Sequence, residues 1–577
     1  MFLLIRGMVI MLAIIFCRFA QAEPVGQQDM FTRQQQQQER LEQAMQSKVD
    51  VRLDANKTDK YDKPTTPLKP EYPCFAIDQI ILSGEQSEDF KFALNDTLKQ
   101  LKFESGMCLG AMGINQIMTL TQNKLIEKGY TTTRILAGAQ NIKTGKLVLT
   151  VIPGKIHAIA YDQHEAKETH IHRLSSLGTQ FPFKAGDVLN LREIEQGIEN
   201  LKRNPTVAAN IQIEPAQMPN ESDVVVRWQQ RTIPFRLSLS VDDSGSKITG
   251  KYQAGMTLAA DNLLGLSDLF YANYNRDIGG KERLAGVNSG TYGYAFHYSV
   301  PFGKWLFSTN YSGYQYHQAV AGLNENYDYH GKSHQLDIKV SRLLQRSQRS
   351  KTYLQAGLWQ RLSDNYINDA RINVQRRRMA GWKIGLSHQQ YIGRRVLNID
   401  VGYKRGTGLW ESLPAPEEVF GEGTSRMKIL TLDVQWYQPF ELGKERFSYE
   451  AYFHHQWNQT PLITQDRLSI GNRYTVRGFD GEVTLMGERG WYWQNTLNWQ
   501  YQGEHQVYLG LDAGRVSGSW MSEQLGRYLM GTVLGFRGTL AWGGRLHYDV
   551  FVGKPLKRPR YFQTQSFSTG FSLSYEF

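Results

Sequence analysis

The chain has no apolar segment long enough to form a membrane-spanning helix. Only 41% of its 577 residues are hydrophobic, and after the first twenty no apolar run reaches the roughly 18 residues that such a helix needs. A chain that spans a membrane without these helices must form a closed β-barrel, which also satisfies every backbone hydrogen bond in lipid. The 30 Tyr, 26 Phe and 12 Trp residues suit the aromatic girdles of a barrel.

The sequence also lacks the marks of nucleic-acid binding and of the common enzyme classes. Its net charge of +11 comes without a long block of Lys or Arg, which is typical of solvated loops and a wet lumen, so no nucleic-acid partner is expected. There is no G-x-S-x-G, H-E-x-x-H or Walker pattern, and no C-x-x-C. The thirteen histidines show no metal-ligand spacing. We expect no catalytic residue, metal or cofactor; a barrel lipase with Ser and His on an outer strand is the enzymatic alternative.

Residues 1–22 have the composition of a secretory signal peptide. Arg6 supplies the positive charge, Met8–Cys17 is apolar, and positions 20–22 form an A-x-A cleavage site. Ten apolar residues are too few for a membrane anchor. The residues around Cys17 do not favour lipidation, because Arg18 follows it and no small residues precede it.

Two cysteines remain after the signal peptide, Cys74 and Cys108. An oxidising periplasm favours a disulfide between them. Such a bond stabilises by roughly 3–4 kcal/mol in the chain-entropy model. Two free thiols are the alternative.

The segments ahead of Cys74 are polar. Residues 23–48 contain a helix-forming run of Gln, Glu and Arg with few apolar side chains. A helix that is polar nearly all round cannot pack in a dry core, so it must lie in water, either as a free tail or inside a wet pore. Residues 49–73 carry a proline at every third position from Pro64 to Pro73, which favours an extended polyproline-II linker.

Residues 74–153 and 154–231 show the same order of periodicities, βααββ. The first segment predicts strands at 75–82, 131–136 and 146–152 and helices at 87–103 and near 114–125. The second predicts strands at 156–160, 207–213 and 224–228 and a helix from 191, capped by Asn190. A short pattern recurs eighty residues apart, Gly106, Leu109 and Ile114 against Gly186, Leu189 and Ile194. The repeat predicts two modules of one type.

From residue 232 to the C-terminus the hydrophobic period becomes two. At the end of the chain Phe571, Leu573, Tyr575 and Phe577 alternate with polar residues, which predicts apolar side chains facing lipid and polar ones facing a lumen. We expect sixteen antiparallel strands, near 235–243, 251–260, 267–276, 289–299, 304–316, 332–343, 351–362, 378–390, 394–406, 426–438, 446–459, 490–501, 506–516, 530–540, 544–553 and 569–577.

The connection lengths support this count. Every second connection is short, and the others are mostly longer, as expected for periplasmic turns and outer loops. An even number of strands returns the C-terminus to the side of the N-terminal modules. The sixth long connection, 460–489, exceeds the ordinary length of a loop. It mixes Val, Tyr and Phe with Arg, which argues for a folded, functional loop.

Five short motifs stand out: Val476-Arg477-Gly478-Phe479 in the sixth loop, Gly510–Gly514 on strand thirteen, Asp261–Asp268 at the first periplasmic turn, Pro73-Cys74-Phe75 and the terminal Phe577. In these motifs the chain resembles the transporters of two-partner secretion, the TpsB family, and most closely their haemolysin/haemagglutinin and contact-dependent-inhibition branches. The resemblance covers the whole mature chain. It implies a sixteen-stranded outer-membrane barrel in a Gram-negative bacterium, two periplasmic POTRA modules, and a plug formed by the N-terminal helix and the sixth loop.

The resemblance also implies a partner for Arg477 at the loop tip. On strand thirteen Asp512 points into the lumen between Gly510 and Gly514, which leave room for a bulky group. A guanidinium can bind a carboxylate through two parallel hydrogen bonds. We expect this pair to hold the loop inward and to do no chemistry; the alternative is that Asp512 is one of many solvated lumen charges.

By the same resemblance, the chain would export a large exoprotein that carries an N-terminal secretion domain. Outer-membrane lipid and the barrel-assembly machinery are its other expected partners. An assembly insertase shares the modules and the loop motif and is the alternative function, although the main insertase carries more than two modules. A plain porin would lack the arm. The sequence leaves open whether the cargo is a haemolysin, an adhesin or a contact-dependent toxin.

Overall fold

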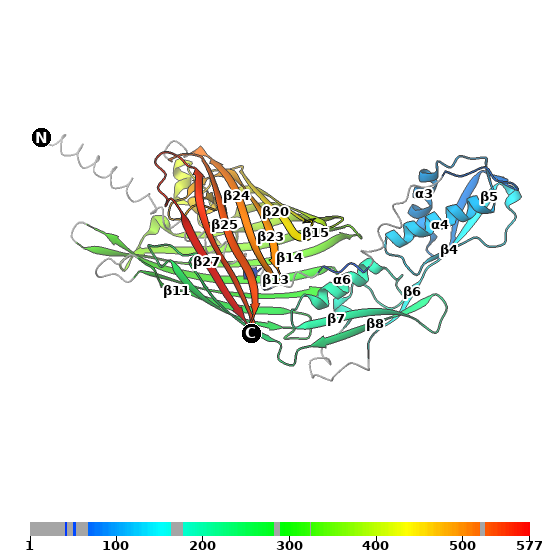
Figure 1. Cartoon of the computed structure of the whole chain (residues 1–577), viewed down its shortest axis with the longest axis horizontal. Helices are drawn as coiled ribbons and strands as arrows, with labels where there is room; N and C mark the ends of the chain where they lie inside the picture. Colours follow the sequence, from blue (N-terminus) through cyan, green and yellow to red (C-terminus); the bar gives the residue numbers. More distant parts are fainter. Residues whose placement is uncertain are drawn as a thin grey trace.

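The computed structural model describes residues 41–42, 45, 50–53, 67–162, 177–281, 289–322, 325–519 and 525–577. The expected signal peptide, most of the polar helix at 23–48 and the middle of the linker lie outside the described residues. Figure 1 shows the barrel at one end of an elongated molecule and the first α/β module at the other, with the second module between them.

The first module packs two helices on a three-stranded sheet. Its elements are β1 (Phe75–Ile77), β2 (Gln79–Gly84), α3 (Ser87–Leu101), β3 (Met107–Leu109), α4 (Ala111–Glu127), β4 (Arg134–Leu136), η2 (Ile142–Thr144) and β5 (Lys146–Ile152). The sheet order is β2-β5-β4. Apolar faces of both helices, including Phe90 and Ile117, fill the core beneath the sheet.

The predicted strand at 75–82 is two strands. β1 pairs with β3, whereas β2 runs parallel to β5. The break falls at Asp78, because the amides of Asp78 and Gln79 both donate to the carbonyl of Gly145. The segment 75–84 therefore pairs first with β3 and then with β5, a change of partner strand that its hydrophobic pattern does not reveal.

Cys74 and Cys108 are joined in a disulfide. Cys108 lies in β3 and Cys74 immediately precedes β1, so the bond fastens the short β1–β3 pair at the start of the module.

This bond has a direct test. Thiol labelling of the exported, denatured chain should give no signal without reductant and two labelled cysteines with it. Changing both residues to Ser should lower the stability of the first module by about 3–4 kcal/mol, because a loop of this length is then unconstrained in the unfolded state. Full labelling without reductant would contradict the assignment.

The second module repeats the arrangement. It contains β6 (Lys155–Tyr161), α5 (Leu177–Gln180), α6 (Leu191–Lys202), β7 (Val207–Pro215) and β8 (Glu221–Gln230), with sheet order β6-β8-β7. Asn190 caps α6 as predicted, its side chain accepting a hydrogen bond from the amide of Arg192.

The recurring glycines occupy equivalent turns. Gly106 and Gly186 have φ of +85° and +88°, a region that favours glycine. Their amides donate to the carbonyls of Ile77 and Ile156, in the first strand of each module. Leu109 and Leu189 are both buried. The short sequence repeat thus records a repeated local structure.

Sixteen strands close into one antiparallel barrel, as predicted. They are β9 (Phe235–Asp242), β10 (Tyr252–Asp261), β11 (Leu269–Gly279), β12 (Gly290–Phe302), β13 (Trp305–Ala321), β14 (Asn326–Arg346), β15 (Ser350–Ile367), β17 (Arg377–Ile392), β18 (Arg395–Thr407), β19 (Lys428–Leu442), β20 (Glu445–Asn458), β23 (Arg489–Gln502), β24 (His505–Ser517), β25 (Tyr528–Ala541), β26 (Arg545–Lys557) and β27 (Ser568–Glu576). The two-residue β16 (Ala370–Arg371) adds a rung to β15. Five residue pairs between β27 and β9 complete the ring.

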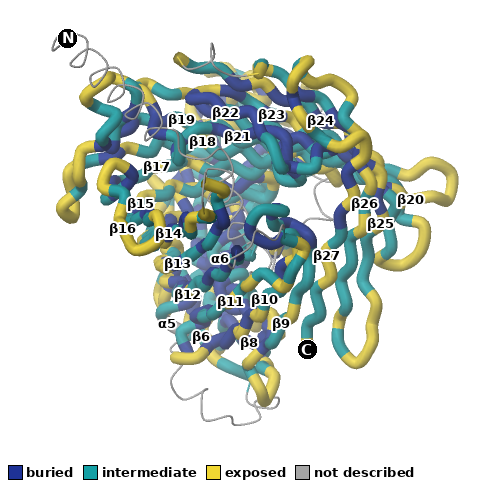
Figure 2. The backbone as a smooth tube through the Cα atoms, turned by 90° about the vertical axis from the view of Figure 1, so that its left-hand side faces the viewer, coloured by how far each residue is buried: buried dark blue, intermediate teal, exposed yellow. Residues whose placement is uncertain are grey.

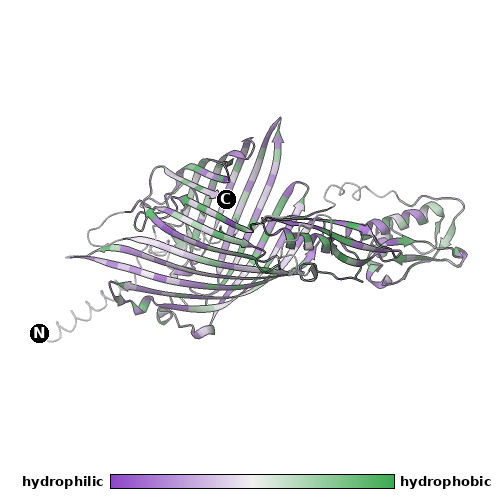
Figure 3. Ribbon diagram, turned by 90° about the horizontal axis from the view of Figure 1, so that it is seen from below, coloured by the Kyte–Doolittle hydropathy of each residue, from purple (hydrophilic) through white to green (hydrophobic). Residues whose placement is uncertain are grey.

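Alternation along the strands separates the two faces of the wall. On β24 the outward Leu509 and Leu511 are 53% and 44% exposed, whereas the inward Tyr508 and Asp512 are 4% and 1% exposed. Figure 3 shows the same alternation of hydrophobic and hydrophilic residues along the barrel strands. Among the described residues no helix is long and apolar enough to cross a bilayer.

Several strands extend further than predicted at the ends remote from the modules. β14 begins at Asn326 and not near 332, and β15 continues to Ile367 and not to 362. The alternating pattern ends where apolar side chains no longer face lipid, but the hydrogen-bonded pairing of β14 with β15 continues beyond that point into water. These polar ends lengthen the hairpins above the lipid-facing band.

The second module is fixed to the periplasmic turns of the barrel. Asp261, at the first turn, accepts two hydrogen bonds from the Arg236 guanidinium (3.1 and 3.0 Å) and one from the amide of Thr206 (3.1 Å). Arg346 of β14 also binds Glu195 and Glu199 of α6. The motif at 261–268 therefore organises the contact between arm and barrel.

Candidate functional site

Residues 459–488, which join β20 to β23, fold back inside the barrel. They contain η7 (Thr464–Asp466) and a small hairpin of β21 (Leu468–Ile470) and β22 (Leu485–Gly487). Figure 2 shows β21 and β22 as buried segments beside β23 and β24. All six residues of these two strands are buried, so the loop forms a folded element within the lumen.

The loop tip carries Arg477, whose side chain binds Asp512 through two parallel hydrogen bonds. Nε donates to Oδ2 at 2.6 Å and Nη2 to Oδ1 at 2.8 Å. The backbone amide of Arg477 also donates to Oδ2 at 2.9 Å, and Nη2 reaches Thr496 Oγ1 on β23 at 2.9 Å. Asp512 is only 1% exposed, so it is not a solvated lumen charge. The structure therefore brings the two sequence-predicted residues together in the geometry of a charge-assisted clamp.

The glycines that flank Asp512 allow this approach. A Cβ added to Gly510 would lie 2.7 Å from Nη2 of Arg477, and one added to Gly514 would lie 2.8 Å from Val476 Cγ2. Real Cβ atoms essentially never come this close to a neighbour. The absence of side chains at Gly510 and Gly514 thus leaves space on the inner wall for the loop tip.

Two further glycines belong to the same contact and were missed by sequence reasoning. A Cβ on Gly531 of β25 would lie 2.0 Å from the carbonyl oxygen of Arg477, and one on Gly553 of β26 would lie 2.7 Å from Gly478 Cα. Gly478 itself has φ of +103°, which favours glycine. The sequence signal that could have identified them is that each glycine falls at a lumen-facing position of its strand, Gly531 in β25 and Gly553 in β26.

Replacing Gly531 by Ala should loosen the seated loop. Overpacking of this kind costs about 1–3 kcal/mol, which corresponds to roughly 5- to 150-fold more frequent opening of the tip. Hydrogen exchange of the amides at 476–479 should therefore accelerate by that factor. Gly402→Ala on β18 is the control, because its Cβ would meet only the rotatable hydroxyl of Thr431. Equal exchange in both variants would show that the wall does not constrain the tip.

Apolar side chains seal the loop behind the clamp. Val476 is fully buried, and Phe479 packs edge-on against Phe562, with ring centroids 5.7 Å apart. Both belong to a cluster that includes Ile470, Leu485 and residues of the wall. Within the sequence motif, Arg477 forms the ion pair, Val476 and Phe479 pack in the apolar cluster, and Gly478 turns the chain.

Charged groups fasten the rest of the loop on two sides of the lumen. Arg473 binds Asp243, just beyond β9. Asp466 at the base of the loop binds Arg361 of β15 at 3.1 Å and Lys404 of β18 at 3.4 Å, and all three lie within the ring of strands. The loop therefore bridges the lumen between opposite parts of the wall.

Three described residues of the N-terminal segment also lie inside the barrel. Leu41, Glu42 and Met45 are helical; Leu41 and Met45 pack with Ala259 and Tyr271 of the wall. Glu42 lies 3.5 Å from Nζ of Lys339. Arg236 donates to the carbonyl of Met45 at 3.3 Å. The rest of the expected plug helix lies outside the described residues.

A cavity of about 650 Å³ lies in the lumen between the described residues of the loop and of the N-terminal segment. Leu41 and Glu42 line one side, and Asp466–Ser469 of the folded loop line another. Asp337, Lys383, Asp400 and Asp433 contribute charge from the wall. A space of this size is much smaller than a folded domain.

Comparison with known families matches both modules and most of the barrel. The profile described as haemolysin secretion/activation protein ShlB/FhaC/HecB matches residues 220–538, a ShlB-type POTRA profile matches 75–154, and a further POTRA profile matches 155–215. The outer membrane transporter CdiB-2 of Burkholderia pseudomallei is 33% identical over 563 residues, 94% of each chain.

Two further relatives agree. The hemolysin transporter protein HpmB of Proteus mirabilis is 26% identical over 415 residues, 71% of each chain. Among solved structures, CdiB from Acinetobacter baumannii superposes with a TM-score of 0.79 at 28% identity, over 96% of this chain and all of the other.

Proposed function

This chain belongs to the ShlB/FhaC/HecB family of haemolysin secretion/activation proteins, and we propose that it exports one large unfolded exoprotein through a lumen gated by the loop at 459–488. It is an outer-membrane transporter of two-partner secretion, with its POTRA modules in the periplasm. The family consists of transporters rather than enzymes. The observation that carries the gating proposal is the clamp between Arg477 and Asp512.

The modules offer sites for capturing an extended chain. β7 is at one edge of the second sheet and β4 at one edge of the first, and the second half of β7 is mostly exposed. An unfolded segment can add to such an edge as a further strand, with main-chain hydrogen bonds giving affinity. We infer that an N-terminal secretion domain of the exoprotein binds here first.

The cargo then needs a path through the barrel. With the loop seated and Leu41 and Glu42 in place, a cavity of about 650 Å³ lies between them. We take this arrangement as the closed state. Withdrawal of the N-terminal segment, with the loop tip still held against the wall by Arg477 and Asp512, would clear a route lined by the polar inner face of the strands.

Folding of the cargo supplies the direction of transport. The periplasm contains no ATP, so passage must be driven by binding and by folding of the exoprotein at the cell surface, which prevents its return. Barrel-assembly machinery would insert the transporter itself, and outer-membrane lipid would surround its apolar band. Whether the cargo is a haemolysin, an adhesin or a contact-dependent toxin depends on what the modules recognise.

Co-expression with a candidate exoprotein tests the function. The exoprotein should reach the medium or cell surface only when both proteins are present, and other outer-membrane proteins should assemble normally in a deletion strain. Loss of outer-membrane assembly without a specific loss of export would instead favour an insertase.

A further inference from the structure

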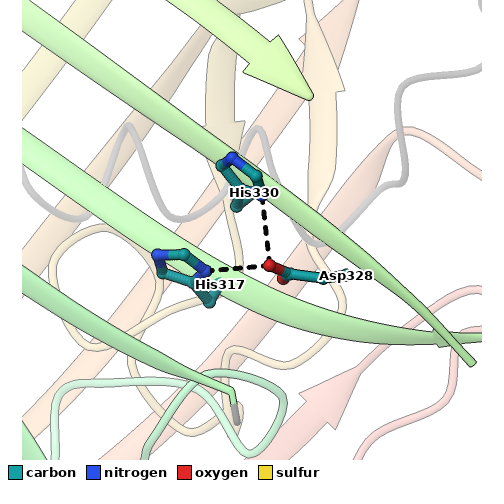
Figure 4. A group of neighbouring side chains, drawn as sticks. All are labelled: His317, Asp328 and His330. Carbon is teal, nitrogen blue, oxygen red and sulfur yellow. Dashed lines mark hydrogen bonds and ion pairs between the residues drawn. The ribbon is translucent and has the colours of Figure 1, made fainter. Parts of the chain in front are cut away.

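Two histidines and an aspartate meet on the outside of the barrel wall, at the end remote from the periplasmic arm. His317 lies on β13, and Asp328 and His330 lie on β14 (Figure 4). His317 and His330 are directly opposite each other in the ladder. Asp328 is two residues from His330, so both project from the same face of the strand. On β13, His317 projects from the same face as Tyr311, an even number of residues away. Tyr311 is exposed on the outer surface of the barrel, so this face points away from the lumen.

The three side chains converge on one point. Nδ1 of His317 and Nδ1 of His330 each lie 3.2 Å from the same oxygen, Oδ2 of Asp328. The three ligand atoms all lie within 4.8 Å of one another. Within the described residues, the other carboxylate oxygen, Oδ1, is buried and has no hydrogen-bond partner.

This spacing matches a metal coordination sphere. Ligands about 2.0–2.2 Å from a tetrahedral zinc ion are themselves about 3.3–3.5 Å apart, close to both observed nitrogen–oxygen separations. Imidazole and carboxylate are ligands that zinc accepts, and sites with three protein ligands keep a fourth position for water. We propose that His317, Asp328 and His330 bind one divalent transition-metal ion, with zinc the best fit, and leave its fourth position open to solvent.

The strands hold these ligands in place before any ion binds. The β13–β14 ladder is continuous from Trp305 to Ala321, which fixes the positions of all three residues. The His330 ring stacks on Tyr366 of β15, with centroids 5.1 Å apart and planes 10° apart. Packing around a ligand in this way orients it toward the metal. A bound ion would cross-link the outer part of this hairpin above the lipid-facing band.

Zinc titration of the full-length chain tests the site. The protein is purified in detergent without a histidine tag and titrated with Zn²⁺ against a chromophoric chelator. We expect one equivalent to bind. Asp328→Asn and His330→Gln should each weaken binding by about 100-fold, because loss of a ligand costs at least as much as loss of its supporting contact. Co²⁺ should give the strong visible absorption of a four-coordinate ion, and both variants should lose it.

His334→Gln is the matched control, since His334 lies on the same strand and face but outside the group. It should bind zinc as the unchanged protein does. Heat-modifiability on gels establishes that each variant is folded. No stoichiometric binding, or equal affinity in folded Asp328→Asn and in the unchanged protein, would overturn the proposal.

Discussion

Replacing Arg477 or Asp512 by Ala should reduce secretion of the exoprotein by at least roughly tenfold while the barrel still inserts and folds. Each change leaves the other charge buried in the lumen, and breaking such a pair costs about 3–5 kcal/mol. That cost shifts the equilibrium between seated and unseated loop by more than roughly 100-fold toward the unseated state, in which the loop tip is free to obstruct the path of the exoprotein. Strand pairing is unaffected, because the clamp joins the loop to the wall and not one strand to the next.

Secretion is measured by the exoprotein in the medium, and barrel folding by heat-modifiability. Arg537→Ala is the matched control: Arg537 also projects into the lumen, from β25, but it binds Glu450 in a more exposed pair. It should have little effect.

The double variant decides whether the two residues act together. With both charges removed, no unpaired charge is left, so the double variant should be little worse than the worse single variant. If the two losses multiply, the residues act independently and the clamp is not what positions the loop.

Deleting residues 27–48 should increase the ion conductance of the barrel several-fold in planar bilayers. A helix of this length is about 33 Å long at 1.5 Å per residue, enough to traverse the lumen. Glu42 lines the cavity in the lumen. Met45 packs on Ala259, near the periplasmic end of the barrel wall. Removing the segment would open a water-filled path alongside the seated loop.

Glu42→Gln is the control for this deletion. It weakens a single 3.5 Å ion pair with Lys339 and leaves the segment present, so conductance should stay near that of the unchanged protein. Unaltered conductance after the deletion would mean that the segment does not obstruct the pore.

The barrel was predictable from sequence because the membrane imposes one rule on every strand. Lipid on one side and water on the other force alternation, as in Leu509 and Leu511 against Tyr508 and Asp512. The strand ends were less predictable, because pairing in β14 and β15 continues after that rule ceases to apply.

The site was predictable only in part, for a different reason. The phase of one strand places Asp512 inward between two glycines, and the family resemblance supplies Arg477. Which neighbouring strands meet the loop depends on the register of the closed barrel, which a sequence does not carry. Gly531 and Gly553 were missed for that reason.

Register also explains why no metal-ligand spacing was recognised among the histidines. His317 and His330 are thirteen residues apart and become neighbours only through the pairing of β13 with β14. A hairpin shifted by one residue would turn one of them to the lumen.

The five residue pairs that close the ring also bear on the order in which the barrel forms. The hydrogen bond between Ser238 and Ser574 spans 336 residues of sequence, whereas other neighbouring strands are consecutive or nearly so. Contacts this distant carry a large loop-closure entropy and form slowly. The free edge of β9 therefore remains unpaired, open to misassociation, until β27 is in place, so closure of the ring must wait for β27.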